Sequence, residues 1–225
     1  MFKYETHLHT SPVSKCARSD VRETLEFYAS LGYDGVFITN HFLDGNINVD
    51  RDLPYEDRIR FYFSDYEAGA AMASELGIKV FPGVELSHAG TDFLVYGLDK
   101  EWYLAHPEIM DMKKTEELPF MMSEGALVVQ AHPYREAHYI DHIRLYPRSV
   151  EGVETLNGNR KPFENEMAAA YANAYGLLRT AGTDNHVGPR TPHLAGMAST
   201  EPIESVADFI AHVRAKDMEL FYEVR

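Results

Sequence analysis

The sequence predicts an α/β fold in which parallel strands form a sheet or a barrel. Short apolar runs alternate with stretches of helical periodicity along the chain, which is typical of successive βα units. No repeat, low-complexity tract or Pro/Gly/Ser-rich linker interrupts this alternation. With 45% hydrophobic and 25% charged residues, the composition is that of an ordinary globular protein. We therefore expect one domain that spans residues 1–225.

The chain opens with a strand, a helix and a second strand. FKYET (2–6) and GVFIT (35–39) have the aromatic and β-branched residues that strands favour. Between them, residues 20–31 place apolar side chains on one helical face, and Gly32 ends that helix.

Residues 42–63 carry Gly, Pro, Asp and Arg without clean periodicity. They predict a long connection, of the kind that forms lids or substrate loops. A helix over 64–76 follows, and then IKVFPGVE (78–85) as one strand and FLVYG (93–97) as the next.

Three further strands bring the expected total to seven. They are ALVVQ (126–130), VEGVETL (150–156) and GLLRTAG (176–182), with a helix over 163–175 before the last. We expect residues 200–225 to add a helix and a terminal strand that pack on the main fold.

Charge and composition exclude several classes of function. The formal net charge is −14, from 35 acidic residues against 21 Lys and Arg, and there is no basic stripe, so we expect no general nucleic-acid binding. No apolar run approaches the roughly 18 residues of a membrane span. The lack of an apolar signal segment and the single cysteine favour a cytoplasmic protein.

Potential metal ligands stand at or just after five of the expected strands. They are His7, His9, His41, Glu85, His132, Asp184 and His186. Parallel strands open their C-terminal ends on one face, so these side chains would meet there. Because a strand alternates faces with a period of two, His7 and His9 share a side. Imidazoles and carboxylates together suit Zn, Mn or Fe, and the set as a whole predicts a metal site.

At these positions the chain resembles the PHP (polymerase and histidinol phosphatase) family. The segments THLHT, TNH, GVE, AHP and GTDNH are similar to its successive motifs, over residues 4–190. The resemblance implies a single-domain, distorted seven-stranded (βα) TIM-like barrel with two or three divalent metal ions at its rim. It also implies hydrolysis of phosphomonoesters or phosphodiesters.

The resemblance assigns ligands to the first two ions. His7, His9 and Asp184 would hold the first. Glu85 would bridge the first and second ions, and His132 would bind the second. We expect Glu85, Asp184 and His132 to form the catalytic centre, because ions held in this way lower the pKa of bound water toward about 7.

His41 and His186 would serve the third ion, with Cys16 where relatives often carry His or Asp. Cys16 is a soft donor that favours Zn or Fe over Mn. Asn40 departs from the family's usual Thr-Asp-His, and this removes a carboxylate that would orient His41.

Two assignments stay open at the level of sequence. The family's further His, between the Glu and His-Pro motifs, has two candidate counterparts, His88 and Asp92. His193 could line the rim or protonate a leaving group.

Four arginines are candidate phosphate clamps, because a guanidinium grips phosphate through two hydrogen bonds. Arg135 and Arg190 follow ligand motifs, Arg160 follows Asn157 and Asn159 just after the strand 150–156, and Arg18 lies near Cys16. Metal ions at the rim would supply the positive charge that an acidic protein needs to bind an anion.

The sequence therefore predicts a metal-dependent hydrolase that cleaves a small phosphoester by attack of metal-bound hydroxide. The expected partner is a small phosphorylated substrate. One alternative is an amidohydrolase-type hydrolase of C–N or C–O bonds, although Glu85 stands where those enzymes usually carry a modified lysine. The other is a non-catalytic, metal-binding structural or regulatory module.

Overall fold

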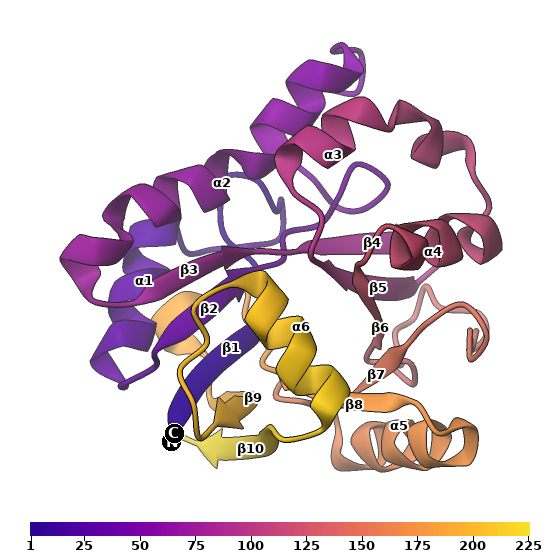
Figure 1. Cartoon of the computed structure of the whole chain (residues 1–225). Coiled ribbons are helices and arrows are strands. Elements are labelled where there is room, and N and C mark those ends of the chain that lie inside the picture. The colour runs from indigo at the N-terminus through magenta and orange to yellow at the C-terminus, as the bar shows by residue number, and fades with distance from the viewer.

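Ten strands form two sheets in the computed structural model of the protein, which describes all 225 residues (Figure 1). The strands of the first sheet are β1 (Phe2–Leu8), β2 (Gly35–Ile38), β3 (Lys79–Pro82), β9 (His193–Ser199) and β10 (Glu219–Val224). Those of the second are β4 (Val84–His88), β5 (Thr91–Tyr96), β6 (Leu127–Ala131), β7 (Gly152–Asn157) and β8 (Leu178–Gly182). The orders are β10–β9–β1–β2–β3 and β4–β5–β6–β7–β8.

Helices surround these sheets. They are α1 (Val21–Ser30), α2 (Tyr55–Leu76), α3 (Lys100–Ala105), α4 (Lys114–Ser123), α5 (Pro162–Tyr175) and α6 (Val206–Ala215), with 3-10 turns at Pro107–Asp111 and Gly188–Arg190. In Figure 1, α1 and α2 lie beside β3, and α5 lies against β7 and β8. None of the helices combines the length and the apolarity that a membrane crossing requires.

The two sheets meet at the ends of their parallel strands. β1, β2 and β3 are parallel, as are β6, β7 and β8, whereas β4, β5, β9 and β10 pair antiparallel. Isolated bridges join Leu8 to Asn185 and His41 to Glu85 across the junction. The protein is thus a single α/β domain, but its hydrogen-bonded ladders remain two sheets and do not close into the expected seven-stranded barrel.

The connection after the second strand is shorter than the sequence predicts. α2 begins at Tyr55, so the irregular part covers residues 42–54 and residues 55–63 are helical. The buried Ile59, Tyr62 and Phe63 lie on one face of this helix, with charged residues just before Ile59 and Arg60 just after it. That spacing is helical, but its apolar stripe is too narrow to stand out from the intervening charges.

The run 78–85 forms two strands rather than one. The two strands are separated at Gly83, where a Cβ atom would lie 2.7 Å from Cγ2 of Thr39. β3 completes the first sheet, and β4 begins the second. Glu85 is therefore the second residue of β4, not the end of a strand as expected.

The expected total of seven strands is wrong, because one expected strand forms both β3 and β4 and because β9 was not predicted. β9 reads HLAGMAS, a buried run of mostly small residues that has neither alternation nor β-branched side chains. It pairs antiparallel with β1 and β10, so its burial comes from its neighbours and not from its own pattern.

Candidate metal centre

The expected metal ligands converge on a cavity of about 580 Å³ at the junction of the two sheets. His7 belongs to β1 and Glu85 to β4, while the others stand in the segments that follow β1, β2, β6 and β8. The cavity wall includes Cys16, His41, Glu85, His132, Asp184 and His186. Residues from both sheets thus meet at one place although up to 179 positions separate them in sequence, from His7 to His186.

The first group of ligand atoms is spaced as a metal ion requires. Nε2 of His7 lies 3.1 Å from Oε1 of Glu85 and 3.5 Å from Oδ1 of Asp184. Nε2 of His9 lies 3.4 Å from both Oε2 of Glu85 and Oδ1 of Asp184. Ligands about 2.0–2.1 Å from a tetrahedral ion stand about 3.3–3.4 Å from one another. The group therefore matches a cation site without rearrangement.

A second group lies on the other side of Glu85. Nε2 of His132 is 3.4 Å from Oε1 of Glu85 and 3.8 Å from Oδ2 of Asp184. His7, Glu85 and His132 place one ligand atom each within 4.8 Å of one another. Glu85 and Asp184 are thus shared between the two groups.

A third group contains three imidazoles and the only thiol. His9, His41 and His186 offer ring nitrogens within 4.8 Å of one another, and Nδ1 of His41 is 2.6 Å from Oε2 of Glu85. Cys16 lines the cavity together with His186 and His41. Burial raises the pKa of the Cys16 thiol, but these two imidazoles outweigh it and lower the pKa to about 6. The thiolate is therefore the main form at neutral pH, as a soft metal ligand must be.

Glu85 has the environment of a carboxylate that needs a cation. Both of its oxygens are buried and neither accepts a hydrogen bond. Burial raises the pKa of Glu85, but the imidazoles of His41, His7 and His9 outweigh it and hold the pKa well below the usual range. Burying a charged carboxylate that accepts no hydrogen bonds destabilises the fold by roughly several kcal/mol, unless a nearby cation balances the charge. The donor set therefore fits divalent metal ions.

The imidazoles are oriented by side chains behind them. Nδ1 of His7 lies 2.9 Å from Oε1 of Glu154, so Nδ1 keeps a proton that it donates to this carboxylate, and Nε2 is the atom that faces the cavity. The other oxygen of Glu154 accepts the backbone N–H of His132 at 3.1 Å. The sequence analysis missed Glu154, one of two glutamates in the expected strand VEGVETL and the only charged residue of β7. Its only signal is a charged residue in an otherwise core-like strand.

Ser14 plays the same part for the third group. Its hydroxyl donates to Oδ1 of Asn40 at 2.8 Å, and so accepts from Nδ1 of His9 at 3.0 Å and from the backbone N–H of His41 at 3.1 Å. The amide nitrogen of Asn40 donates to Oδ2 of Asp65 at 3.1 Å. Asn40 itself has no carboxylate, but Asp65 supplies one as the next member of this hydrogen-bond chain, behind Asn40 as seen from His41.

The backbone is strained at two ligands. Asp184 and His132 have φ angles of 58° and 26°, which residues other than glycine rarely adopt. The N–H of Asp184 donates to the carbonyl of His7 at 2.8 Å and fixes that conformation. Such strain is retained where the surrounding structure imposes it, often at functional sites.

Electrostatics divide the imidazoles into two kinds. Burial lowers the pKa of His7, but Glu154, Asp184 and Glu85 outweigh it and hold the pKa well above the usual range. Burial and the neighbouring His186 and His41 hold the pKa of His9 well below it. His9 is therefore ready to bind a metal ion, whereas His7 must first release a proton.

The structure separates the two candidates for the ligand between the Glu and His-Pro motifs. Asp92 pairs with Ser87 across the β4–β5 ladder, so it lies on the same face as Glu85. It lines the cavity, with Oδ2 4.0 Å from Nε2 of His132. His88 points to the opposite face and borders a different cavity.

Only one of the four candidate arginines lines the metal cavity. Arg135 borders it, and its Nη2 lies 2.8 Å from Oδ2 of Asp92. Arg190 is exposed and donates to the carbonyl of Arg18, which is also exposed. Arg160 borders a separate surface hollow together with His193. The ring of His193 hydrogen-bonds there with the hydroxyl of Tyr222 at 2.9 Å.

The fold is similar to that of solved structures of low sequence identity. A two-domain protein from Bacteroides vulgatus, described as containing a PHP-like metal-dependent phosphoesterase, is 14% identical with a TM-score of 0.68 over 98% of this chain. The chain spans 64% of that protein's length. A protein from Bifidobacterium adolescentis, described as a metal-dependent phosphoesterase, is 12% identical with a TM-score of 0.60, over 96% of both chains.

A third similar structure is an amidohydrolase from Chromobacterium violaceum with bound sulfate and no metal. It is 13% identical, with a TM-score of 0.57 over 96% of this chain and 97% of its own. The sequence matches no protein-family model and no curated protein. At these identities the likeness establishes the fold, so the chemistry has to be argued from the cavity itself.

Proposed function

We propose that the protein is a metal-dependent phosphoesterase that hydrolyses a small phosphoester in the cavity described above. One observation carries the proposal. Oε1 of Glu85 faces His7 and His132, and Oε2 faces His9 and His41, at 2.6–3.4 Å. A single carboxylate between four imidazoles is placed to be shared by two or three cations.

The chain's own residues divide the tasks of such a centre. His7, His9 and Asp184 would hold one ion, and His132 a second, with Glu85 shared. His41, His186 and Cys16 would hold a third, and the thiolate favours Zn or Fe over Mn there. When bound, the ions would supply Lewis acidity and lower the pKa of a coordinated water toward about 7.

Arg135 is the group best placed to bind the phosphate. It lines the cavity, and its buried Nε has no hydrogen-bond partner. Asp92 holds one end of the guanidinium through Nη2 at 2.8 Å, which leaves Nε to donate to an oxyanion. Because the protein carries a net charge of −14, a fixed cation and metal ions are needed to hold an anionic substrate there.

The first test joins metal content to activity in one preparation. The protein is purified without chelators and its metals are quantified by mass spectrometry. Hydrolysis of p-nitrophenyl phosphate and of bis(p-nitrophenyl) phosphate is then assayed with added Mn, Fe or Zn. We expect two or three metal ions per chain and turnover of at least one ester, and the preferred ester separates monoesterase from diesterase activity.

Three variants assign the activity to this cavity. Glu85→Gln should lose bound metal and about 100-fold or more in activity, since it removes the shared charge. Arg135→Gln should raise KM and leave the metal content unchanged. Arg60→Gln, on an exposed position of α2, is the matched control. Stoichiometric metal without turnover of either ester would contradict the proposal and favour the amidohydrolase or non-catalytic alternatives.

A further inference from the structure

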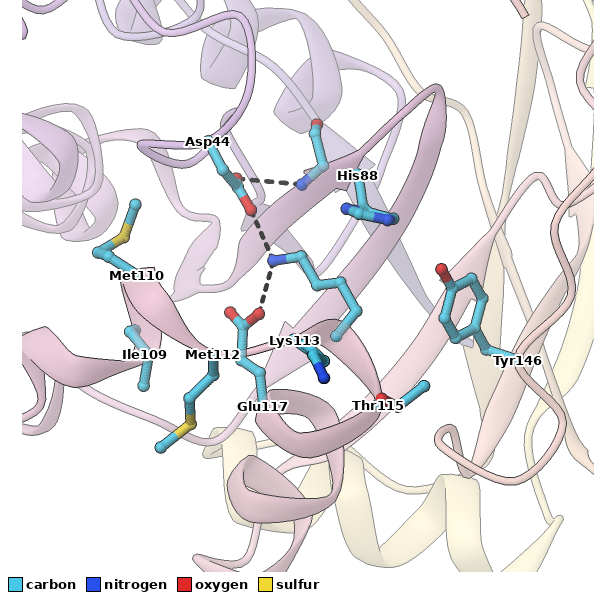
Figure 2. Close-up of a pocket in the computed structure, with 11 residues that line it drawn as sticks. Asp44, His88, Ile109, Met110, Met112, Lys113, Thr115, Glu117 and Tyr146 are labelled. Atoms are coloured by element: carbon cyan, nitrogen blue, oxygen red, sulfur yellow. Dashed lines mark hydrogen bonds and ion pairs between the residues drawn. The ribbon is translucent and has the colours of Figure 1, made fainter. Parts of the chain in front are cut away.

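A second cavity, of about 480 Å³, lies beside the metal cavity (Figure 2). Ser87 lines both cavities. Asp44 borders the second cavity, while the next two residues, Gly45 and Asn46, border the first. The two cavities are therefore neighbours, separated by the Asp44–Asn46 turn and Ser87.

The boundary between the two cavities is thin at Gly45, which packs directly against Ser87 and His41. A Cβ atom on this residue would lie 2.9 Å from Oγ of Ser87 and 3.2 Å from Cβ of His41. Because glycine has no side chain, this point of the boundary carries only backbone and the Ser87 hydroxyl. The two cavities are therefore separated at this point by one backbone segment and one hydroxyl group.

The wall of the second cavity is held by a buried cation. Nζ of Lys114 lies 2.7 Å from both Asp44 and Glu117, and its side chain is 9% exposed. Asp44 also accepts the backbone N–H of Ser87 at 3.1 Å. Figure 2 shows these three contacts as one chain. These contacts connect the 42–54 segment, β4 and α4. Because Asp44 and Glu117 already pair with Lys114, this lysine is not available to bind an anionic ligand.

Other groups in this cavity lack partners within the protein. Lys113 is exposed and forms no ion pair, and neither the ring of His88 nor the hydroxyl of Tyr146 makes a hydrogen bond. In Figure 2, His88 and Tyr146 lie at one side of the view and Met110 and Met112 at the other. The cavity thus contains the unpaired ammonium group of Lys113 and the polar ends of His88 and Tyr146, with the methionine side chains on the opposite side.

This arrangement suits an organic group with an apolar body and a negative charge. Ser87 is two residues from Glu85 on β4, so the second cavity begins about 7 Å from the metal centre. We propose that it binds the leaving group of the substrate, an alcohol that carries a second anionic group, carboxylate or phosphate, on an apolar spacer. This inference rests on the proposed phosphoesterase function and names the substrate class.

The test compares two esters that differ by one charge. The probes are 2-naphthyl phosphate and 6-carboxy-2-naphthyl phosphate, assayed with the metal-loaded protein. We expect kcat/KM for the carboxylated ester to be higher by about threefold to fivefold, since one ion pair with an exposed lysine supplies about that factor. Lys113→Gln should abolish this preference and Lys113→Glu should reverse it, since only the carboxylated ester carries the charge that Lys113 would contact.

Lys161→Glu is the matched control, because Lys161 precedes α5 as Lys113 precedes α4. The control should keep the preference. A preference that survives Lys113→Glu, or an equal loss on both esters, would overturn the inference.

A binding measurement separates this inference from the proposed function. The fluorescent alcohol 6-hydroxy-2-naphthoate is titrated into the protein, with no turnover required. Binding that weakens about tenfold in Lys113→Glu and not in Lys161→Glu supports the leaving-group cavity even if neither ester is hydrolysed. No binding of this alcohol to the wild-type protein would overturn the inference, even where 2-naphthyl phosphate is hydrolysed.

Discussion

Oε1 of Glu154 lies 2.9 Å from Nδ1 of His7, and both side chains are fully buried. The same carboxylate accepts the backbone N–H of His132 through its other oxygen. His7 belongs to the first sheet, whereas Glu154 and the strand before His132 belong to the second. One buried carboxylate therefore sets the relative position of two metal ligands that come from different sheets.

We predict that Glu154→Gln lowers metal affinity by about 10- to 100-fold, the usual effect of removing a group that orients a ligand. Glutamine keeps the shape but has only one acceptor oxygen. If that oxygen faces His7, the amide nitrogen faces the N–H of His132, and two donors then oppose each other. The measurement is a competition titration of zinc against a chelator of known affinity.

Circular dichroism and thermal unfolding of the metal-free protein serve as the control for folding in this experiment. Glu166→Gln, on the exposed side of α5, is the matched surface variant and should bind zinc as the wild type does. Zinc affinity in Glu154→Gln within about twofold of the wild type would show that His7 does not need this carboxylate.

Asn40→Asp should destabilise the protein, although it restores the acid expected from the resemblance. The amide nitrogen of Asn40 lies 3.1 Å from Oδ2 of Asp65, and both residues are buried. Aspartate at position 40 would set two carboxylate oxygens against each other with no proton between them. We expect a loss of about 2–3 kcal/mol in unfolding free energy at pH 8. The loss should shrink at pH 5, where the two groups can share a proton.

The double variant Asn40→Asp with Asp65→Asn tests the cause. It exchanges donor and acceptor, so it should regain most of the stability that the single Asn40→Asp variant loses. Urea unfolding of all four proteins at pH 8 gives the coupling free energy. Additive losses in the two single variants would mean that the carboxylates do not interact.

Many of the metal ligands could be predicted from the sequence, because the alternation of side chains along a strand depends only on neighbouring residues. His7 and His9 lie two residues apart on the same side of the extended chain, and their Nε2 atoms are 3.2 Å apart. The same rule explains His88 and Asp92 once the β4–β5 pairing is known. Without that register, both residues were equal candidates for one role.

What the sequence could not provide depends on contacts distant in the chain. Glu154 reads as one of two glutamates in the expected strand VEGVETL, and its partner His7 is 147 residues away. Arg160 and Arg190 stand in the segments that follow expected strands, yet they lie outside the cavity because the direction of a loop is not encoded by neighbouring residues. The two-sheet arrangement likewise depends on the break at Gly83, which only its closeness to Thr39 explains.

Gly182→Ala should damage the fold and the site together. A Cβ atom at Gly182 would lie 2.5 Å from Cβ and 2.9 Å from the backbone nitrogen of His7. The backbone atom cannot give way, so β1 and β8 must move apart just before Asp184. We expect a loss of about 3 kcal/mol in unfolding free energy together with weaker zinc binding.

Thermal unfolding and zinc titration check both effects of this substitution. Gly152→Ala is the control, since its nearest neighbour would be a flexible side-chain atom, Cγ2 of Val129, at 3.2 Å. A Gly182→Ala protein that unfolds and binds zinc like Gly152→Ala would show that the two strands have room to adjust.

The ion pairs of Lys114 lead to a prediction about pH. Burial lowers the pKa of Lys114, but Asp44 and then Glu117 outweigh it, so the lysine stays charged. Burial raises the pKa of Glu117 to about 7, although Lys114 opposes that shift. Asp44 is thus the main partner of Lys114, and Glu117 is a second carboxylate that is buried at a cost.

The sign follows from proton binding. Between the unfolded pKa of 4.5 and the folded pKa of about 7, the folded state binds more protons at Glu117 than the unfolded state does. The stability that this group contributes is complete below pH 4.5 and is lost as the pH rises through 7. The full shift corresponds to about 3 kcal/mol. Glu117→Gln cannot titrate, so it should not show this loss.

Urea unfolding of the metal-free protein between pH 5 and pH 8 measures the effect as a difference. The wild type should lose about 2.5 kcal/mol more than Glu117→Gln over this range, because other titrating groups are common to both and cancel. Glu116→Gln, one residue earlier on the exposed side of α4, should follow the wild type. Parallel curves for the wild type and Glu117→Gln would mean that Glu117 is charged in the folded protein at no cost. Lys114 would then be shared equally between the two carboxylates.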